Sequence, residues 1–443
     1  MPPGTSPRVC IVCQNASYRF GGEASLPWLC FKYLRQRNAD VYLVAHERTR
    51  PELLEGFPND HDRLFFSPDT ALERSLWRAG KLLPGKIDEQ TLTVLRQVQN
   101  QKHQRRIVRR LIAEKQIQLV HEINPVSPKM VSLMHDLGVP VLIGPLAGGM
   151  TYPPAFSHMD SLAGRMVESS VRALSNFSNW LIPGKRRAAG LIVANDRAKS
   201  ALPPKITGKI FHIPDVGVDL QVWNDRARIE SRDDNEIRFI YLGRILELKG
   251  LQFLIPAFKT IAQQEPRAML YILGDGPYRQ TLQEMTSREN LQDRVKFVGW
   301  VAADEGVRRL RAADVFVFPS LREVGGIVLL EAMAVGLPII TTNWGGPAIH
   351  VTDATGIHVE PTSQESFISG LRDAMLKLAT SPELRKQMGE AGIHRVRGNL
   401  YDWNEKTTRL LEIYHELLSQ NAHGVAVGST PLQLSAPARN TQP

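Results

Sequence analysis

Two glutamates, Glu323 and Glu331, stand eight residues apart in the segment FPSLREVGGIVLLEAMAVGLPII. Glu323 follows an apolar run that is typical of a buried strand, and Gly325 and Gly326 allow a ligand to approach the backbone closely. Glu331 falls among apolar neighbours inside a predicted helix. Because a buried carboxylate needs a hydrogen-bonding partner, the hydroxyl groups of a ligand would satisfy it, and a structural ion pair is the alternative.

A second candidate group lies in the segment GRILELKG, where Gly243 and Arg244 follow an apolar run and Lys249 comes five residues later. Two cations on a glycine-bearing loop that opens a helix suit a diphosphate, because backbone N–H groups and the helix dipole add to the positive charge. Cations that are only exposed to solvent are the alternative interpretation.

Short apolar runs that alternate with helix-length amphipathic segments must position these residues. Nearly continuous apolar strands separated by helices are typical of parallel sheets covered on both faces. The sequence therefore predicts an α/β fold with two Rossmann-like, doubly wound parallel-sheet domains, in which ligands bind beyond the strand ends. The predicted strands are 8–13, 40–45, 119–123, 139–144, 190–195, 209–214, 237–243, 268–274, 294–299, 314–320, 337–343 and 355–360.

A polar, acidic stretch, WNDRARIESRDDNE, separates the two sets of predicted strands, and we place the domain boundary just before it. The first domain is then residues 1–208, and the second is residues 209–399. An apolar-rich helical stretch is expected at about 400–420. Residues 421–443 have no periodicity and are expected to form a disordered tail.

Composition excludes several classes of protein. The 443-residue chain is too long for one ordinary domain and, with 43% hydrophobic residues, too apolar to be disordered. No stretch approaches the roughly 18 apolar residues of a membrane span, and the N-terminus lacks the apolar core of a secretory signal, so a soluble, cytoplasmic protein is expected. Three cysteines are too few for a disulfide scaffold or for a zinc site built on four thiolates.

Positive charge is concentrated in the first half of the chain, because residues 1–210 hold 29 Lys and Arg against 17 Asp and Glu. A basic helical face could contact the anionic inner surface of a membrane, nucleic acid or a phosphorylated substrate, or could simply be solvated. Nucleic acid is not expected as a partner, because aromatic residues for base stacking make up only 7% of the chain. The cations of this face are Arg105, Arg106, Arg109 and Arg110, and Trp77 beside Arg74, Arg78 and Lys81 could add an apolar anchor.

In this order, the motifs resemble those of retaining glycosyltransferases of the GT-B fold, specifically family 4, the glycosyl transferases group 1. Glu323 and Glu331 match the Glu-(seven residues)-Glu motif of that family. GRILELKG and ILGDGP are similar to its donor-domain signatures, and the resemblance covers about 400 residues. The first domain contributes Gly21-Gly22 with Glu23, which resembles the first glycine loop, and His121-Glu122, which resembles the strand end that carries the active-site histidine.

Two departures from the family pattern stand out. The aromatic residue usual near the two glycines is absent from Val324-Gly325-Gly326-Ile327, which affects sugar selectivity more than the reaction type. The usual Pro-Asn-Gly-Val-Asp turn reads Pro214-Asp215-Val216-Gly217-Val218-Asp219.

The resemblance implies a nucleotide-diphosphate sugar as donor and a hydroxyl acceptor, which could be a polysaccharide, a lipid-linked intermediate or a small glycoside. It implies no cofactor and no metal, since two cations would stabilise the leaving diphosphate. Glu331 would accept hydrogen bonds from the ribose, and the loop after 294–299 would contact the base. Implied catalytic residues are Glu323, His121, Arg244 and Lys249. Implied donor-binding residues are Gly21, Gly22, Gly243, Arg244, Lys249, Gly299, Trp300, Val301, Glu323, Gly325, Gly326, Ile327 and Glu331.

The resemblance also implies that the last helix crosses back to complete the first domain and that a cleft separates the two domains. The glycine-rich segment 143–156 is expected to line an acceptor pocket with Tyr152 and Phe156. A GT-B sugar-nucleotide epimerase, which would bind the same donor, is the alternative function.

Overall fold

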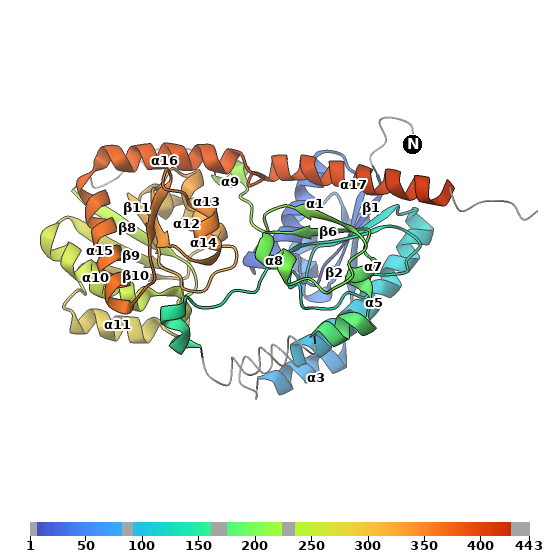
Figure 1. The fold of residues 1–443 in the computed structure, drawn as a ribbon, viewed down its shortest axis with the longest axis horizontal. Coiled ribbons are helices and arrows are strands. Elements are labelled where there is room, and N and C mark those ends of the chain that lie inside the picture. Colours follow the sequence, from blue (N-terminus) through green and yellow to red (C-terminus); the bar gives the residue numbers. More distant parts are fainter. Residues whose placement is uncertain (1–6, 82–91, 161–174, 224–234, 427–443) are drawn as a thin grey trace, which may run out of the picture.

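The computed structural model describes residues 7–81, 92–160, 175–223 and 235–426, with side chains to residue 420. It contains two domains, each built on a parallel sheet covered by helices, and α16 and α17 run along one edge of both domains (Figure 1).

The first sheet has the strand order β3-β2-β1-β4-β5-β6-β7, and all neighbouring strands are parallel. Its central strands are buried on both faces, as their continuous apolar sequences predict. The strands are β1 (Val9–Val12), β2 (Val41–His46), β3 (Leu64–Ser67), β4 (Leu119–Glu122), β5 (Val141–Leu146), β6 (Gly190–Val193) and β7 (Lys209–His212).

The second sheet has the strand order β10-β9-β8-β11-β12-β13 and is also entirely parallel. The order reverses between β8 and β11, the position at which doubly wound sheets bind their ligands. The strands are β8 (Ile237–Leu242), β9 (Ala268–Leu273), β10 (Val295–Gly299), β11 (Val315–Phe318), β12 (Ile339–Thr342) and β13 (Gly356–Val359).

Helices cover both sheets and connect their strands (Figure 1). In the first domain and the linker they are α1 (Ser25–Gln36), α2 (Arg50–Gly56), α3 (Ala71–Gly80), α5 (Leu92–Lys115), α7 (Gly184–Arg187), α8 (Asp196–Ser200) and α9 (Leu220–Trp223). The others are α10 (Leu251–Gln264), α11 (Arg279–Arg288), α12 (Ala303–Arg311), α13 (Ile327–Ala334), α14 (Gly345–His350), α15 (Gln364–Thr380), α16 (Pro382–Arg397) and α17 (Trp403–Ala426). Short 3-10 turns are η1 (Gly22–Ala24), η2 (Glu47–Thr49), η3 (His61–Arg63), η4 (Pro154–Met159) and η5 (Glu247–Lys249).

The predicted domain boundary is wrong by one strand. Residues 209–214 were assigned to the second domain, but β7 pairs with β6 at the edge of the first sheet. A strand at the end of one domain has the same apolar sequence pattern as a strand at the start of the next, so periodicity does not separate them. The first domain therefore continues to β7, and the boundary falls between β7 and β8.

The C-terminal helix α17 packs against α1 and so completes the first domain. Its buried side chains include Trp403, Ile413 and Tyr414, which lie in the same core as α1 and β1. The helix continues to Ala426, so the predicted start of the tail at residue 421 is wrong, whereas residues 427–443 lie outside the described residues.

The segment after β5 leaves the first domain and docks into the second. Phe156, in η4, is completely buried, with its ring 5.3 Å from that of Phe253 and 5.8 Å from that of Phe367. The expectation that Phe156 lines an acceptor pocket is therefore wrong, because an apolar ring gains more from the second core than from a solvated cleft. Arg322 Nε also donates a hydrogen bond to the carbonyl of Met150 at 3.0 Å, which connects the segment after β5 to the loop after β11.

Candidate active site

Lys249 and Glu323 form an ion pair at the carboxyl ends of the adjacent strands β8 and β11. Both side chains are largely buried, with 15% and 17% of their surfaces exposed. The ammonium group of Lys249 also lies 5.2 Å from the centre of the Phe318 ring. The two residues were predicted to bind different parts of a ligand, and the structure shows that they also fix each other's position.

Lys249 is placed by the tight approach of η5 to the end of β11. Gly250, which follows it, has φ of 73°, and a Cβ atom there would lie 2.1 Å from the carbonyl oxygen of Pro319. Only glycine fits this position. The close approach of Pro319 therefore explains why the loop before α10 ends in a glycine.

Arg244 follows β8 and is exposed. Its carbonyl accepts a hydrogen bond from the Tyr241 hydroxyl at 3.0 Å, which holds the backbone of the Gly243–Arg244 turn. Among the residues that the structure describes, none makes a hydrogen bond or ion pair with its guanidinium. This cation is therefore available to an anionic ligand beside Lys249.

The glycine pair opens helix α13 directly after Glu323. Gly326 is the N-cap residue with φ of 76°, and the helix starts at Ile327. The first N–H groups of a helix have no partner within the helix and carry partial positive charge, so this terminus favours an anion or a polar ligand. The carbonyl of Glu323 accepts a hydrogen bond from the N–H of Gly346, in α14, at 3.0 Å. This bond holds the loop after β11 in place.

Glu331 projects from the second turn of α13. Its carboxylate has no hydrogen bond or ion pair with any residue in the described part of the chain, and burial raises its pKa to about 7. The carboxylate also contributes to the raised pKa of Tyr18, a residue of the β1–α1 loop. A carboxylate with no partner among the described residues can accept hydrogen bonds from the hydroxyl groups of a ligand.

The glycine loop of the first domain is organised by a residue that the sequence did not single out. Asn124, just after β4, accepts a hydrogen bond from Gln14 N–H at 2.6 Å and donates to the carbonyl of Asn15 at 3.1 Å. It thereby holds the loop that carries Gly21 and Gly22, whose φ angles are 62° and 52°. The signal that could have revealed Asn124 is a polar side chain directly after a buried strand.

The base-side residues Gly299, Trp300 and Val301 lie at the end of β10, on the same sheet edge but two strands from β8. Trp300 is 76% exposed. The structure therefore joins Lys249 to Glu323 and places Arg244 and the glycine pair on the loops after the adjacent strands β8 and β11. Glu331 lies in the helix that these glycines open, and the predicted base-contacting loop lies two strands from β8.

His121 does not reach this site, and its predicted contact with the sugar is wrong. The ring is buried in the first domain, where Nδ1 lies 2.7 Å from the Tyr414 hydroxyl and Nε2 lies 2.9 Å from the Gly144 carbonyl. Both nitrogens are therefore satisfied. Burial lowers the pKa of His121 to about 4, so the ring is neutral and helps to hold α17 on the first sheet.

We predict that the free energy of unfolding falls less steeply in acid for His121→Gln than for the wild type. A histidine whose pKa falls from 6.5 to about 4 on folding binds its proton more tightly in the unfolded chain, so stability falls as the pH decreases through this window. The slope due to this group is at most about 1.4 kcal/mol per pH unit. Urea unfolding at pH 7, 6 and 5 would show a smaller pH dependence in His121→Gln, and an unchanged dependence would contradict the assignment.

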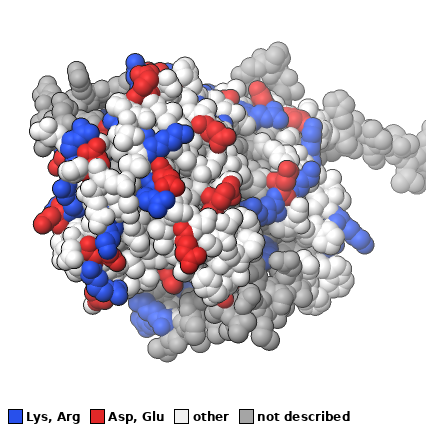
Figure 2. All heavy atoms as spheres, turned by 60° about the vertical axis from the view of Figure 1, so that its left-hand side comes forward, with Lys and Arg blue, Asp and Glu red and all other residues white. Residues whose placement is uncertain are grey.

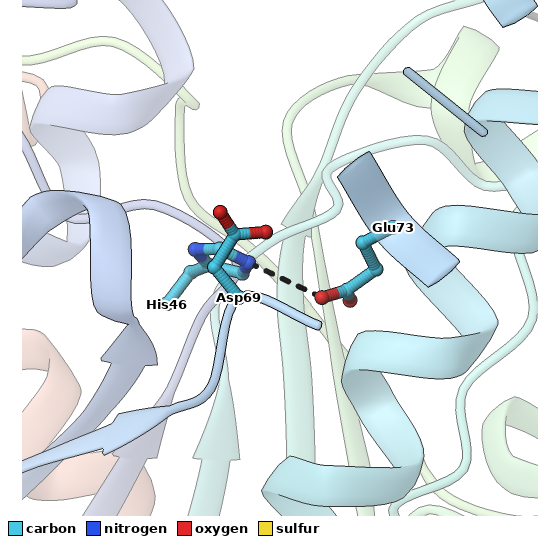
Figure 3. Close-up of side chains that lie close together, drawn as sticks. All are labelled: His46, Asp69 and Glu73. Atoms are coloured by element: carbon cyan, nitrogen blue, oxygen red, sulfur yellow. Dashed lines mark ion pairs between the residues drawn. The ribbon is translucent and has the colours of Figure 1, made fainter. Parts of the chain in front are cut away.

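A separate cluster of His46, Asp69 and Glu73 has the ligand types of a metal site (Figure 3). Nδ1 of His46 accepts a hydrogen bond from Arg48 N–H at 3.2 Å, so the proton of the neutral ring is on Nε2, which faces Glu73 at 3.6 Å. Glu73 also accepts hydrogen bonds from Thr70, which caps α3. A protonated nitrogen does not ligate a metal, so helix capping explains this cluster better.

Charge on the second domain is mixed rather than concentrated. Figure 2 shows Lys and Arg interspersed with Asp and Glu on the face that this view brings forward. Among the described residues, there is no helix with the length and apolar character needed to cross a membrane.

Comparisons with known proteins agree with this geometry. Residues 223–395 match the family described as glycosyl transferases group 1. The GDP-mannose-dependent monoacylated alpha-(1-6)-phosphatidylinositol monomannoside mannosyltransferase of Corynebacterium glutamicum is 33% identical over 178 residues, which are 39% of this chain and 45% of that protein. The chain spans about half the length of the curated relatives it matches.

Two solved structures share the fold over nearly the whole chain. Sucrose-phosphate synthase from Thermosynechococcus elongatus has a TM-score of 0.64 and 18% identity, covering 93% of this chain and 100% of that one. HepE of Anabaena in complex with UDP has a TM-score of 0.61 and 16% identity, covering 92% and 100%. The predicted GT-B fold is thus confirmed. Residues 223–395, which match the family described as glycosyl transferases group 1, contain the second sheet and the Lys249–Glu323 pair.

Proposed function

We propose that this protein is a retaining glycosyltransferase that moves a sugar from a nucleotide-diphosphate sugar to a hydroxyl acceptor. The observation that carries the proposal is the Lys249–Glu323 pair at the switch point of the second sheet. On the loop after β8 and in helix α13 it is accompanied by the Arg244 guanidinium and the Glu331 carboxylate, neither of which has a partner among the residues that the structure describes. A diphosphate, a sugar and a ribose each find a chemically matched partner there. The epimerase alternative has no support from the family match.

The residues of the site suit a reaction on one face of the sugar. The bond between the anomeric carbon and the leaving phosphate oxygen breaks, and the acceptor oxygen bonds to the same face of that carbon. The acceptor proton passes to the leaving phosphate, so no protein nucleophile is required. Arg244, Lys249 and the α13 N-terminus would stabilise the negative charge that develops on the diphosphate.

Glu323 would orient the sugar in this scheme. Its carboxylate is held by Lys249, and Gly325, Gly326 and Ile327 follow it closely at the start of α13. Glu331 would accept hydrogen bonds from the ribose hydroxyl groups. Ionisation of this carboxyl group is favoured once hydroxyl donors surround it, which offsets the burial that raises its pKa.

The test is turnover with UDP-, GDP- and ADP-sugars, followed by NMR of the released or transferred sugar. One donor class should be consumed with the α or β configuration of its anomeric carbon preserved. Inversion of that configuration would contradict the retaining assignment, and conversion to an epimeric nucleotide sugar would restore the alternative.

We predict that transfer does not require a divalent metal, because Arg244, Lys249 and a helix terminus supply the positive charge that a metal would otherwise provide. Initial rates in EDTA should equal those in Mg²⁺ or Mn²⁺. Complete loss of activity in EDTA that Mg²⁺ or Mn²⁺ restores would refute this prediction.

The proposal includes a peripheral contact with anionic membrane, supported by exposed aromatic side chains in the basic first domain. Trp77 on α3 is 50% exposed, with the ammonium of Lys81 3.7 Å from its ring centre. Trp180, in the helical residues 175–181, is 63% exposed and stacks on Phe177, which is 58% exposed. Tryptophan rings beside cations are suited to the interface of a membrane.

The basic face on α5 is smaller than the sequence predicted. Arg105 is half-buried and donates a hydrogen bond to the carbonyl of Leu133, so it is committed to the fold. Arg106, Arg109 and Arg110 are exposed, although Arg110 lies 3.8 Å from Glu114.

We therefore predict that the protein co-sediments with phosphatidylglycerol vesicles and is released as salt rises, because each cation near the surface contributes about 1 kcal/mol. The triple change Arg106→Gln, Arg109→Gln and Arg110→Gln should weaken sedimentation, as should Trp77→Ala with Trp180→Ala, while hydrolysis of a soluble donor stays unchanged. Equal binding to neutral phosphatidylcholine vesicles, or no binding by the wild type, would contradict a contact with anionic membrane. These cations would then only be exposed to solvent.

A further inference from the structure

A groove of about 650 Å³ lies along α1 where the first domain meets the linker to the second. Helix α1 and the loop after α2 form one side of it, and Asp219 and Val222 of the linker and α9 form the other. Its volume is within the roughly 300–1,000 Å³ of small-molecule sites. None of the donor-side residues on the second sheet lines it.

The charged residues that line the groove neutralise one another. Lys32 forms an ion pair with Asp219, whose other carboxylate oxygen accepts a hydrogen bond from the Tyr33 hydroxyl at 2.7 Å. Arg35 Nε donates to Asp60 at 2.8 Å. Because the two lining cations are matched by two lining carboxylates, the groove offers no net charge, which disfavours phosphates and other ions as ligands.

Aromatic and amide side chains provide the remaining surface. The half-buried indole of Trp28 packs on Phe57 with ring centres 4.7 Å apart, and both residues line the groove. Gln36 and the exposed Asn59 border them. A flat apolar ring flanked by amides suits a ligand with an apolar face and hydroxyl groups at its rim, which describes a sugar ring.

The groove adjoins the glycine loop of the first domain at Tyr18. This residue lines the groove and belongs to the loop that carries Gly21 and Gly22. Burial and the charges of Glu331 and Asp219 raise the pKa of Tyr18 to about 12.

We propose that this groove is a saccharide subsite that holds a neutral sugar unit of the acceptor, remote from the hydroxyl that receives the transferred sugar. Its assignment to the acceptor rests on the proposed function, whereas its binding of a neutral sugar does not. Trp28 supplies the stacking surface, and Asn59 supplies hydrogen bonds to hydroxyl groups. The Gln36 amide beside it also exchanges two hydrogen bonds of 3.3 Å with the amide of Gln221.

Two variants test the groove without touching the donor site. Trp28→Ala removes the stacking surface. Gly56→Ala keeps Trp28 but places a Cβ atom 2.2 Å from the end of its indole ring, so the ring has to leave its position. Trp77→Ala is the matched control, because it removes an exposed tryptophan from α3.

The experiment is saturation-transfer difference NMR of the full chain with maltotriose, cellotriose and α-1,6-mannotriose, and with glucose 6-phosphate as an anionic probe. At least one neutral trisaccharide should bind the wild type and Trp77→Ala equally, and both groove variants should weaken it about tenfold or more. Absence of binding by all three trisaccharides, unchanged binding in both groove variants, or preference for glucose 6-phosphate would overturn the proposal.

Nucleoside diphosphate binding, measured in parallel, separates the two proposals. If UDP, GDP or ADP binds and no trisaccharide does, the subsite fails while the proposed function stands. If a trisaccharide binds in the groove and no nucleoside diphosphate binds, the assignment of that sugar to an acceptor is overturned.

Discussion

Replacing Arg244 with Ala should reduce sugar transfer by about a hundredfold or more and leave the fold intact. Among the described residues the guanidinium has no hydrogen bond or ion pair to lose, whereas the developing charge on the diphosphate would lose a charge-assisted partner. Such a loss costs about 3 kcal/mol in the transition state, which corresponds to this factor. Initial rates at saturating donor, with circular dichroism as the check of folding, measure the effect.

Arg372→Ala is a matched control for this variant. Arg372 lies on α15 and pairs with its neighbour Asp373, away from the switch point of the second sheet. It should retain the wild-type rate. If folded Arg244→Ala turned over like the wild type, the diphosphate assignment would have to be abandoned.

Breaking the Lys249–Glu323 pair should affect stability and activity in different ways. Lys249→Met and Glu323→Gln each leave a largely buried charge without its partner, and each should lower the free energy of unfolding by about 3 kcal/mol. The double variant removes both charges and should recover most of this stability. It should nevertheless stay inactive, because the groups that bind the diphosphate and the sugar are both missing.

Urea unfolding and initial rates of the four proteins complete this cycle. Recovery of stability together with recovery of activity in the double variant would show that the pair is only structural. Recovery of stability without activity is the outcome that a role in donor binding predicts.

Most strands could be predicted because they are short apolar runs, and central strands such as β1, β2 and β11 are buried on both faces. The exception is β3, in which Leu64–Ser67 directly follows the charged residues 61–63. Its outer position in the sheet leaves Phe65 and Phe66 only half-buried, so its sequence carries a weaker signal.

The positions of the predicted donor-side residues at strand ends could be read from the sequence, because Arg244, Lys249 and Glu323 lie on the two loops that follow β8 and β11. What the sequence does not contain is the pairing of Lys249 with Glu323, since residues 74 positions apart meet only through the sheet order. The loop at Trp300 follows β10, which lies two strands from β8, and this distance likewise depends on the order of strands in the sheet.

The first domain was harder to interpret because its decisive contacts are distant in sequence. His121 follows the pattern of a strand-end histidine, yet its partner Tyr414 lies 293 residues away on α17. Phe156 has the local sequence of a surface loop but is buried in the core of the other domain. In both residues a tertiary contact, invisible to local pattern, determines the role.

The measurement that tests the account most directly is isothermal titration of UDP, GDP and ADP, and of the 2′,3′-dideoxy analogue of whichever binds, into the wild type and Glu331→Ala. The account predicts that the wild type prefers the ribonucleotide over the dideoxy analogue and that Glu331→Ala binds both equally, because the carboxylate acts only on the ribose hydroxyl groups. An undiminished preference in folded Glu331→Ala, or no binding of any nucleoside diphosphate by the wild type, would contradict the proposed donor site.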